Sequence, residues 1–209
     1  MAILLVLFLA LQMRQDRDVH WIHWMVVVFL SIVGTLLTDN LSDNLGVSLY
    51  ASAPAFAAAL MVTFILWYRS EHTLSIHEID TPRRGAFYWA AILFTFALGT
   101  AAGDLVAEQF QLGYLTAAAI FGGAITLITL CYYAFRLNPV LAFWLAYILT
   151  RPLGASIGDL LTQKRPDGGM GLETMPVSGV FLIIIVGLVG YLSVQAQRER
   201  ASGRLGAGA

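Results

Sequence analysis

Long apolar stretches separated by short polar connectors make up most of the chain. They cover, approximately, residues 1–13, 20–41, 50–68, 86–107, 113–135, 139–161 and 176–195. A segment that crosses a bilayer must satisfy its own backbone polar groups, which favours α-helices. The pattern therefore predicts an all-α, polytopic membrane bundle of about seven transmembrane helices, with the lipid bilayer as its partner.

The first stretch, MAILLVLFLALQM, differs from the others in length. It is shorter than the roughly 20 apolar residues that a span requires. It also lacks the basic n-region and the small-residue cleavage site of a signal peptide. We interpret it as the end of a helix whose beginning is absent.

Composition supports the membrane class and excludes several functions. Of the 209 residues, 58% are hydrophobic and 12% are charged, whereas about 25% of a soluble domain is charged. No polar stretch is long enough to bury a core, so residues 1–197 form one transmembrane domain. Residues 198–209 are expected to be a disordered cytoplasmic tail. The net charge of −1 argues against a nucleic-acid partner.

The basic residues are distributed unequally between the two sides of the predicted bundle. One side receives nine of them: Arg14, Arg17, Arg69, Arg83, Arg84, Arg136, Arg198, Arg200 and Arg204. The other side receives two, Lys164 and Arg165. Cytoplasmic loops are rich in Lys and Arg, so we expect a multi-pass protein of the bacterial inner membrane with its N-terminus outside and its C-terminus in the cytoplasm.

One motif recurs three times along the chain. A Trp is followed ten residues later by a Gly, and five residues further by an Asp. The copies are WMVVVFLSIVGTLLTD (Trp24, Gly34, Asp39), WAAILFTFALGTAAGD (Trp89, Gly99, Asp104) and WLAYILTRPLGASIGD (Trp144, Gly154, Asp159). Such spacing indicates tandem repeats over residues 20–85, 86–138 and 139–197, preceded by a remnant at 1–19. Each repeat pairs a motif helix with a plainer second helix.

The tryptophans are predicted to be anchors at the cytoplasmic interface, together with His20, Trp21, His23, Trp67, Tyr68, Phe87 and Tyr88. The fifteen residues from Trp to Asp rise about 22 Å in a helix, which places each Asp toward the outer side. Small residues allow helices to approach closely. This packing role is expected for Gly34, Gly99, Gly103, Gly154 and Gly158, and the glycine directly before an Asp also allows the backbone to unwind.

A second polar residue follows each Asp by four positions. These residues are Asp43, Glu108 and Gln163. Residues four apart share a helix face, and two acids on one face repel unless a proton, a cation or a basic group separates them. Arg151, two turns before Asp159, is the predicted counter-ion.

Ionisable residues within a span are functional candidates by default. Asp39, Asp104 and Asp159 are predicted to converge as ligands of a metal ion or as proton carriers. Asp43, Glu108 and Gln163 would support these ligands or gate access to them. Thr35 and Thr100 would add hydroxyl ligands. Oxygen ligands suit Mg²⁺, Ca²⁺ or Mn²⁺. The alternative is structural, with the aspartates capping broken helices and bonding across the bundle.

The motif blocks VGTLLTDNLSDNLG, ALGTAAGDLVAE and RPLGASIGDLLTQ resemble a bacterial family of uncharacterised inner-membrane proteins. The resemblance extends from about Trp24 to Leu192. It implies tandem repeats of two transmembrane helices each, and no activity. That family typically has four copies, whereas this chain has three motif helices, and its first helix falls where the second helix of a first copy would end. More distantly, the motif helices look like those of bacterial families that export Mn²⁺ or exchange cations for protons.

The leading functional hypothesis is a secondary transporter of a small cation, which leaves open a divalent ion such as Mn²⁺ and coupling to protons. The alternative is a non-transporting membrane scaffold or partner protein. An enzyme is not expected, because the spans hold no Ser–His or Cys–His pair and no H-E-x-x-H motif. No cofactor is expected. The sequence leaves the oligomeric state open, a homo-oligomer included.

Overall fold

The fold comes from a computed structural model that describes residues 2–13, 20–76 and 81–206. Within these residues lie seven α-helices: α1 (Ala2–Met13), α2 (His20–Asp39), α3 (Leu49–Glu71), α4 (Pro82–Asp104), α5 (Gly113–Phe135), α6 (Pro139–Thr162) and α7 (Thr174–Gly206). Two π-helical turns, η1 (Asn40–Asn44) and η3 (Leu105–Gln109), extend α2 and α4, and a 3₁₀ turn, η4 (Arg165–Asp167), follows α6. The described part of the chain contains no strand.

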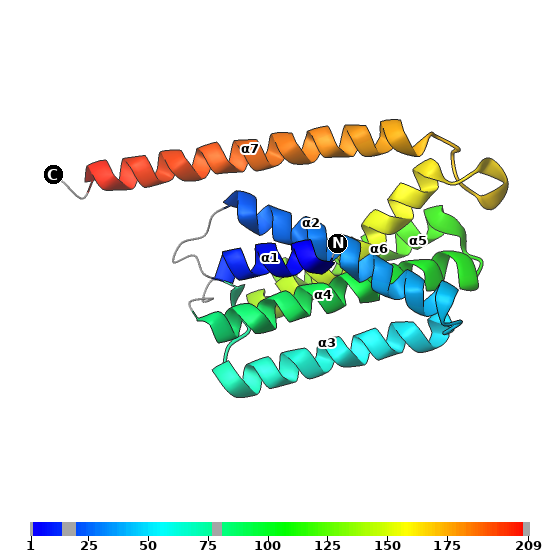
Figure 1. Cartoon of the computed structure of the whole chain (residues 1–209), viewed down its shortest axis with the longest axis horizontal. Helices are drawn as coiled ribbons and strands as arrows, with labels where there is room; N and C mark the ends of the chain where they lie inside the picture. Colours follow the sequence, from blue (N-terminus) through cyan, green and yellow to red (C-terminus); the bar gives the residue numbers. More distant parts are fainter. Residues whose placement is uncertain (1, 14–19, 77–80, 207–209) are drawn as a thin grey trace.

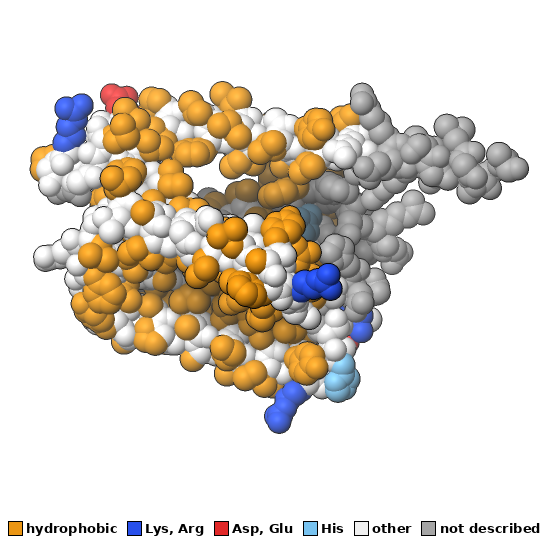
Figure 2. Space-filling view, turned by 180° about the vertical axis from the view of Figure 1, so that it is seen from behind, with side chains coloured by type: hydrophobic (Ala, Val, Ile, Leu, Met, Phe, Trp, Pro, Cys, Tyr) orange, Lys and Arg blue, Asp and Glu red, His pale blue; other side chains and the backbone are white. Residues whose placement is uncertain are grey.

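Six of these helices, α2 to α7, are long and apolar enough to cross a membrane, whereas α1 is a shorter apolar helix. Hydrophobic side chains cover much of the visible outer face of the bundle (Figure 2). In a bilayer such a surface faces lipid rather than water. The all-α membrane fold expected from the sequence is confirmed.

The helices pack in a regular order, with α4 at the centre. α2 and α6 both pack against α4, while α1, α3 and α5 pack along α2, α4 and α6 (Figure 1). The second helix of one repeat therefore packs on the motif helix of the next repeat. This order leaves α4 as the most deeply buried span, with half of its most apolar window inside the protein.

Capping residues in the connectors define where the motif helices begin. Thr81 precedes Pro82, and its hydroxyl accepts a hydrogen bond from the backbone N–H of Arg84 at 3.2 Å. Asn138 precedes Pro139 and accepts hydrogen bonds from two backbone N–H groups. A side-chain cap followed by proline is a strong signal for a helix start.

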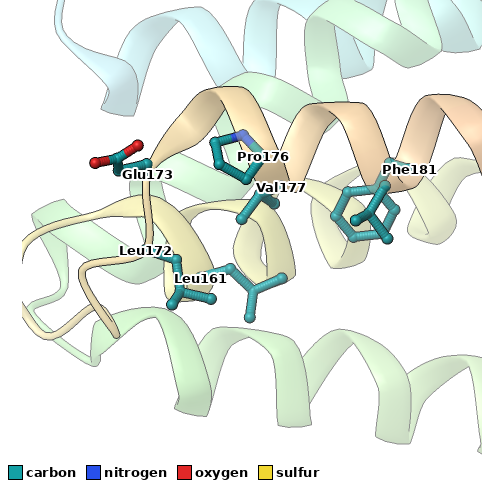
Figure 3. A pocket seen from close by; sticks show the side chains of 7 residues that line it. Leu161, Leu172, Glu173, Pro176, Val177 and Phe181 are labelled. Carbon is teal, nitrogen blue, oxygen red and sulfur yellow. The ribbon is translucent and has the colours of Figure 1, made fainter.

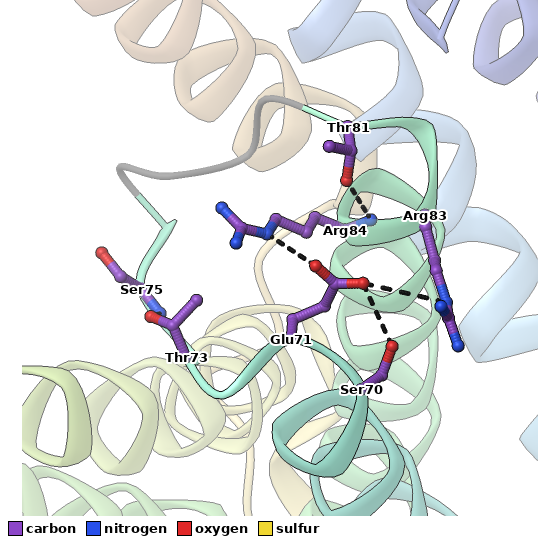
Figure 4. A network of polar contacts seen from close by, with 7 residues as sticks. All are labelled: Ser70, Glu71, Thr73, Ser75, Thr81, Arg83 and Arg84. Carbon is purple, nitrogen blue, oxygen red and sulfur yellow. Dashed lines mark hydrogen bonds and ion pairs between the residues drawn. The ribbon is translucent and has the colours of Figure 1, made fainter.

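An ion pair ties the end of α3 to the start of α4. Glu71 accepts a hydrogen bond from Nε of Arg84 at 2.9 Å, and Arg83 lies 3.8 Å from the same carboxylate (Figure 4). The Arg84 side chain is 23% exposed and the Arg83 side chain 71%. Exposed pairs contribute little, so Arg84 is the arginine that stabilises this turn.

Two of the repeated tryptophans lie inside the protein rather than at a lipid interface. Trp89 and Trp144 are 5% and 4% exposed, and Trp67 of α3 is fully buried. The indole N–H of Trp144 donates to the carbonyl of Leu74 at 3.0 Å. The prediction of interfacial anchors is therefore wrong for these three residues, because neighbouring helices cover their rings. It fits Trp21 and Tyr68, which are exposed.

α7 stands apart from the other helices. Its first turn lies near the end of α6, with a pocket between them lined by residues such as Leu161, Val177 and Phe181 (Figure 3). The most apolar window of α7 has no buried residue. The helix continues to Gly206, into the stretch expected to be disordered; this stretch contains helix-forming Arg, Glu, Ala and Leu. Residues 207–209 lie outside the described part.

Candidate functional site

Asp39 and Asp104 occupy equivalent places, each as the last α-helical residue before a π-helical turn. The i→i+5 hydrogen bonds of the π turn begin directly after the aspartate, at Asn40 in η1 and at Leu105 in η3. π turns are rare and occur frequently at functional sites. The third copy differs, because α6 continues to Thr162 and then ends in an extended residue.

The three motif aspartates lie at the same end of the bundle, and each is partly buried. Asp104 on the central helix is in their midst. Its carboxylate interacts electrostatically with the carboxylates of Asp39 and Asp159, and also with that of Glu108. Asp104 therefore lies within electrostatic range of an aspartate from each of the other two repeats.

The residues four positions after each Asp are placed less uniformly than the helical spacing predicts. Glu108 lies within η3, is exposed, and accepts a hydrogen bond from the hydroxyl of Tyr114 at 3.2 Å. Gln163 lies beyond the end of α6, in an extended conformation. Gln163 and Asp159 therefore do not share a helix face, because the helix ends between them. The side chain of Asp43 lies outside the described part.

A directed chain of hydrogen bonds joins the three motif helices below the aspartates. Nη2 of Arg151 on α6 donates to Oγ1 of Thr35 on α2 at 2.7 Å. Oγ1 of Thr35 lies 3.4 Å from Oγ1 of Thr100 on α4. The hydroxyl of Thr100 in turn donates to the carbonyl of Phe96 at 3.2 Å. Since the one hydroxyl hydrogen of Thr100 goes to Phe96, Thr35 accepts from Arg151 and donates its own hydrogen to Thr100.

Arg151 is held by packing as well as by its hydrogen bond. Its guanidinium carbon lies 5.0 Å from the centre of the Phe96 ring, a cation–π distance. Its aliphatic stem passes against Gly99, where any Cβ would overlap Cβ and Cγ of Arg151. The guanidinium interacts electrostatically with Asp104. The predicted counter-ion therefore faces the acid of the central repeat rather than serving its own helix alone.

Successive motif helices contact each other in the same way. The residue three positions before the motif glycine of one helix packs against the motif glycine of the preceding motif helix. A Cβ on Gly34 would lie 2.7 Å from Cβ of Phe96, and Gly99 meets Arg151 in the same way. Phe96 and Arg151 each stand three residues before the motif glycine of their own helix. A Cβ on Gly103 would make ordinary contacts at 3.7 Å. Close approach therefore depends on Gly34 and Gly99.

The acids do not form a ready-made metal site in this arrangement. Among the described residues, no three of His, Cys, Asp or Glu lie close enough together to hold a metal ion. Tight binding of Mn²⁺ or Ca²⁺ requires six or more oxygen ligands around one point. Asp39, Asp104 and Asp159 would have to move toward one another to coordinate a single ion.

Some residues of the site carry no signal that sequence reasoning used. Phe96 and Tyr114 are apolar or aromatic positions within spans, and only the fold brings them to Arg151 and Glu108. Phe96 shares its position in the repeat with Arg151. A comparison of the residues three before each motif glycine would have linked the two.

Comparison with known families accounts for the repeats. The family model described as Repeat of Unknown Function (DUF347) matches three times in tandem, at residues 22–73, 87–138 and 142–198. The chain belongs to this family. The resemblance drawn from the motif blocks is thereby confirmed, and DUF347 carries no stated activity. No curated protein and no solved structure matches the chain.

Proposed function

We propose that this membrane protein is a secondary transporter of a small cation, in which the clustered carboxylates exchange that cation for protons. The observation that carries the proposal is the electrostatic interaction of Asp104 with Asp39 and Asp159, which belong to the other two repeats, and with the partly buried Arg151. An acidic residue within a span is expensive and rarely kept without a function.

The balance of charge supports a cation. The carboxylate of Asp104 interacts with three others, those of Asp39, Glu108 and Asp159, and with the guanidinium of Arg151. Full ionisation would leave three negative charges uncompensated in a medium of low polarity. Carboxylates that share a site cannot all be charged without compensation, so the cluster needs protons or cations.

The fixed position of Arg151 supports exchange rather than permanent neutralisation. The guanidinium is held by Thr35 and by the ring of Phe96, so it cannot follow each carboxylate in turn. Within the described residues its Nε has no hydrogen-bond partner. The negative charge of the carboxylates that Arg151 does not neutralise must therefore be balanced by mobile ions. Since the described acids are too dispersed for a metal centre, a monovalent cation fits this geometry better than a divalent one.

The test is flux across a membrane. Vesicles containing the purified protein and an internal pH dye receive an outward or inward gradient of Na⁺, K⁺ or Mn²⁺, one at a time. One of these gradients is expected to drive a pH change that Asp104→Asn abolishes. Glu173→Gln, which removes an exposed acid outside the cluster, is the matched control and should retain the flux. Equal pH changes in Asp104→Asn and the unmodified protein would rule out the proposal.

The non-transporting scaffold remains the competing function, and the bare faces of α6 and α7 favour it. A scaffold moves no ion in either form. In that case Asp104→Asn would alter the stability of the protein or its recovery with a partner, and no cation gradient would change the internal pH.

A further inference from the structure

The packing rule between motif helices stops at the third repeat. Gly34 is filled by Phe96 of the next motif helix, and Gly99 by Arg151. At Gly154, however, no described atom lies within 4 Å of the place that a Cβ would occupy, and the same is true at Gly158. The face of α6 that would receive a next motif helix is open.

α7 is open on the same side of the fold. In the first two repeats the second helix, α3 or α5, packs along the following motif helix. Within the described residues α7 packs along no following motif helix, and its main contact is with α6. Figure 2 shows the hollow that this leaves between α7 and the rest of the bundle.

The outer end of this hollow is an apolar pocket of about 470 Å³. Its walls are formed by Leu161 at the end of α6 and by the first turns of α7, including Val177 and Phe181 (Figure 3). Glu173 is the one charged residue among those that line the pocket, and the apolar remainder fits an apolar helix.

Only one equivalent position on the motif helices is left to pack against Gly154. The residues three before the motif glycines are Ser31, Phe96 and Arg151. Phe96 already packs against Gly34, and Arg151 already packs against Gly99. Ser31 on α2 is partly exposed, and the open glycine therefore has one matching position.

The neighbouring helix α1 leaves Ser31 accessible. α1 packs on the face of α2 that carries Phe29, whose ring stacks on Phe8 at 5.3 Å. Two residues along an α-helix point about 200° apart. Ser31 therefore faces away from α1.

We propose that a second copy of this chain docks head to tail, with its α2 against the open face of α6 and its Ser31 opposite Gly154. The contact continues the interface already formed between α2 and α4 and between α4 and α6. Glycine and serine permit the close approach that stabilises helix pairs in lipid. A rotation about the membrane normal relates the copies, so the topology of each is unchanged. Such a contact closes into a ring when the rotation permits.

Paired cysteines test the contact directly. In a Cys131→Ala background, one tagged copy carries Ser31→Cys and a differently tagged copy carries Gly154→Cys. Mild oxidation in native membranes is expected to join the two tags, because the paired Cα atoms would lie within the disulfide range. Each variant alone should give no crosslink, and neither should Ser31→Cys with Thr129→Cys, which places the second thiol on the exposed face of α5.

A second variant separates association from folding. Gly154→Leu inserts a side chain where the single chain has open space and replaces glycine by a better helix former, so the unfolding midpoint of the monomer should be no lower than that of the unmodified protein while its mass falls to one chain. The proposal does not depend on transport. It is overturned if Gly154→Cys crosslinks to itself, which would indicate paired α6 helices, or if the unmodified protein is a monomer whose hollow is filled by lipid.

Discussion

Close approach of α4 and α6 at Gly99 is the feature of the site most open to a quantitative test. Gly99→Ala adds one methyl group at a place where Cβ and Cγ of Arg151 already lie. Cβ is fixed to the backbone, so it cannot swing aside as the end of a flexible side chain could. The two helices must separate, or Arg151 must leave Thr35.

The expected cost follows from matched substitutions. Overpacking a well-packed contact costs about 1–3 kcal/mol, while replacing Gly by Ala within a helix gains up to about 1 kcal/mol. Gly154→Ala has the same gain without the overlap, because nothing lies within 4 Å of its Cβ. The propensity term cancels between the two variants. Gly99→Ala should therefore be about 1–3 kcal/mol less stable than Gly154→Ala.

The assay is reversible unfolding in mixed micelles, followed by circular dichroism, at a protein concentration where the chain is monomeric. Gly103→Ala serves as a second control on α4, since its Cβ would make only ordinary contacts at 3.7 Å. Its midpoint should lie near that of Gly154→Ala. Equal midpoints for Gly99→Ala and Gly154→Ala would show that α4 and α6 are not in close contact there.

Two further substitutions probe the polar contacts. Thr35→Val removes the acceptor of Arg151 and should destabilise the protein by about 1–3 kcal/mol in the same unfolding assay, whereas Thr129→Val, which removes a hydroxyl bonded within its own helix, should change little; a loss equal in both would contradict the bridge. Trp144→Phe deletes the hydrogen bond to Leu74 and should cost about 0.5–1.5 kcal/mol; an unchanged midpoint would mean that this bond adds no net stability.

The helices themselves could be predicted because hydropathy and caps specify them locally. The stretch 113–135 is observed unchanged as α5, and 139–161 is observed as Pro139–Thr162. Their ends are marked by polar residues, glycine and an Asn–Pro pair. Such signals act within a few residues, so no knowledge of the tertiary fold was needed.

The site could be predicted only in part, because its geometry depends on contacts between repeats. The spacing of Arg151 and Asp159 suggested a partner on the same helix, but Arg151 bonds to Thr35, 116 residues away. The hydropathy pattern does not predict the π turns after Asp39 and Asp104. A π turn differs from an α-helical turn in its backbone hydrogen bonds and needs no change in composition. Gln163 was misplaced because a four-residue spacing assumes a continuous helix, whereas α6 ends at Thr162.

The central claim is that the clustered carboxylates hold protons and give them up to a cation. Its most direct measurement is proton release from the purified protein in unbuffered detergent solution on addition of NaCl, KCl or MnCl₂. The unmodified protein and Glu173→Gln should release protons with at least one of these salts, in a saturable manner, and Asp104→Asn should release markedly fewer. Release that is absent with every salt, or equal in all three proteins, would contradict the account.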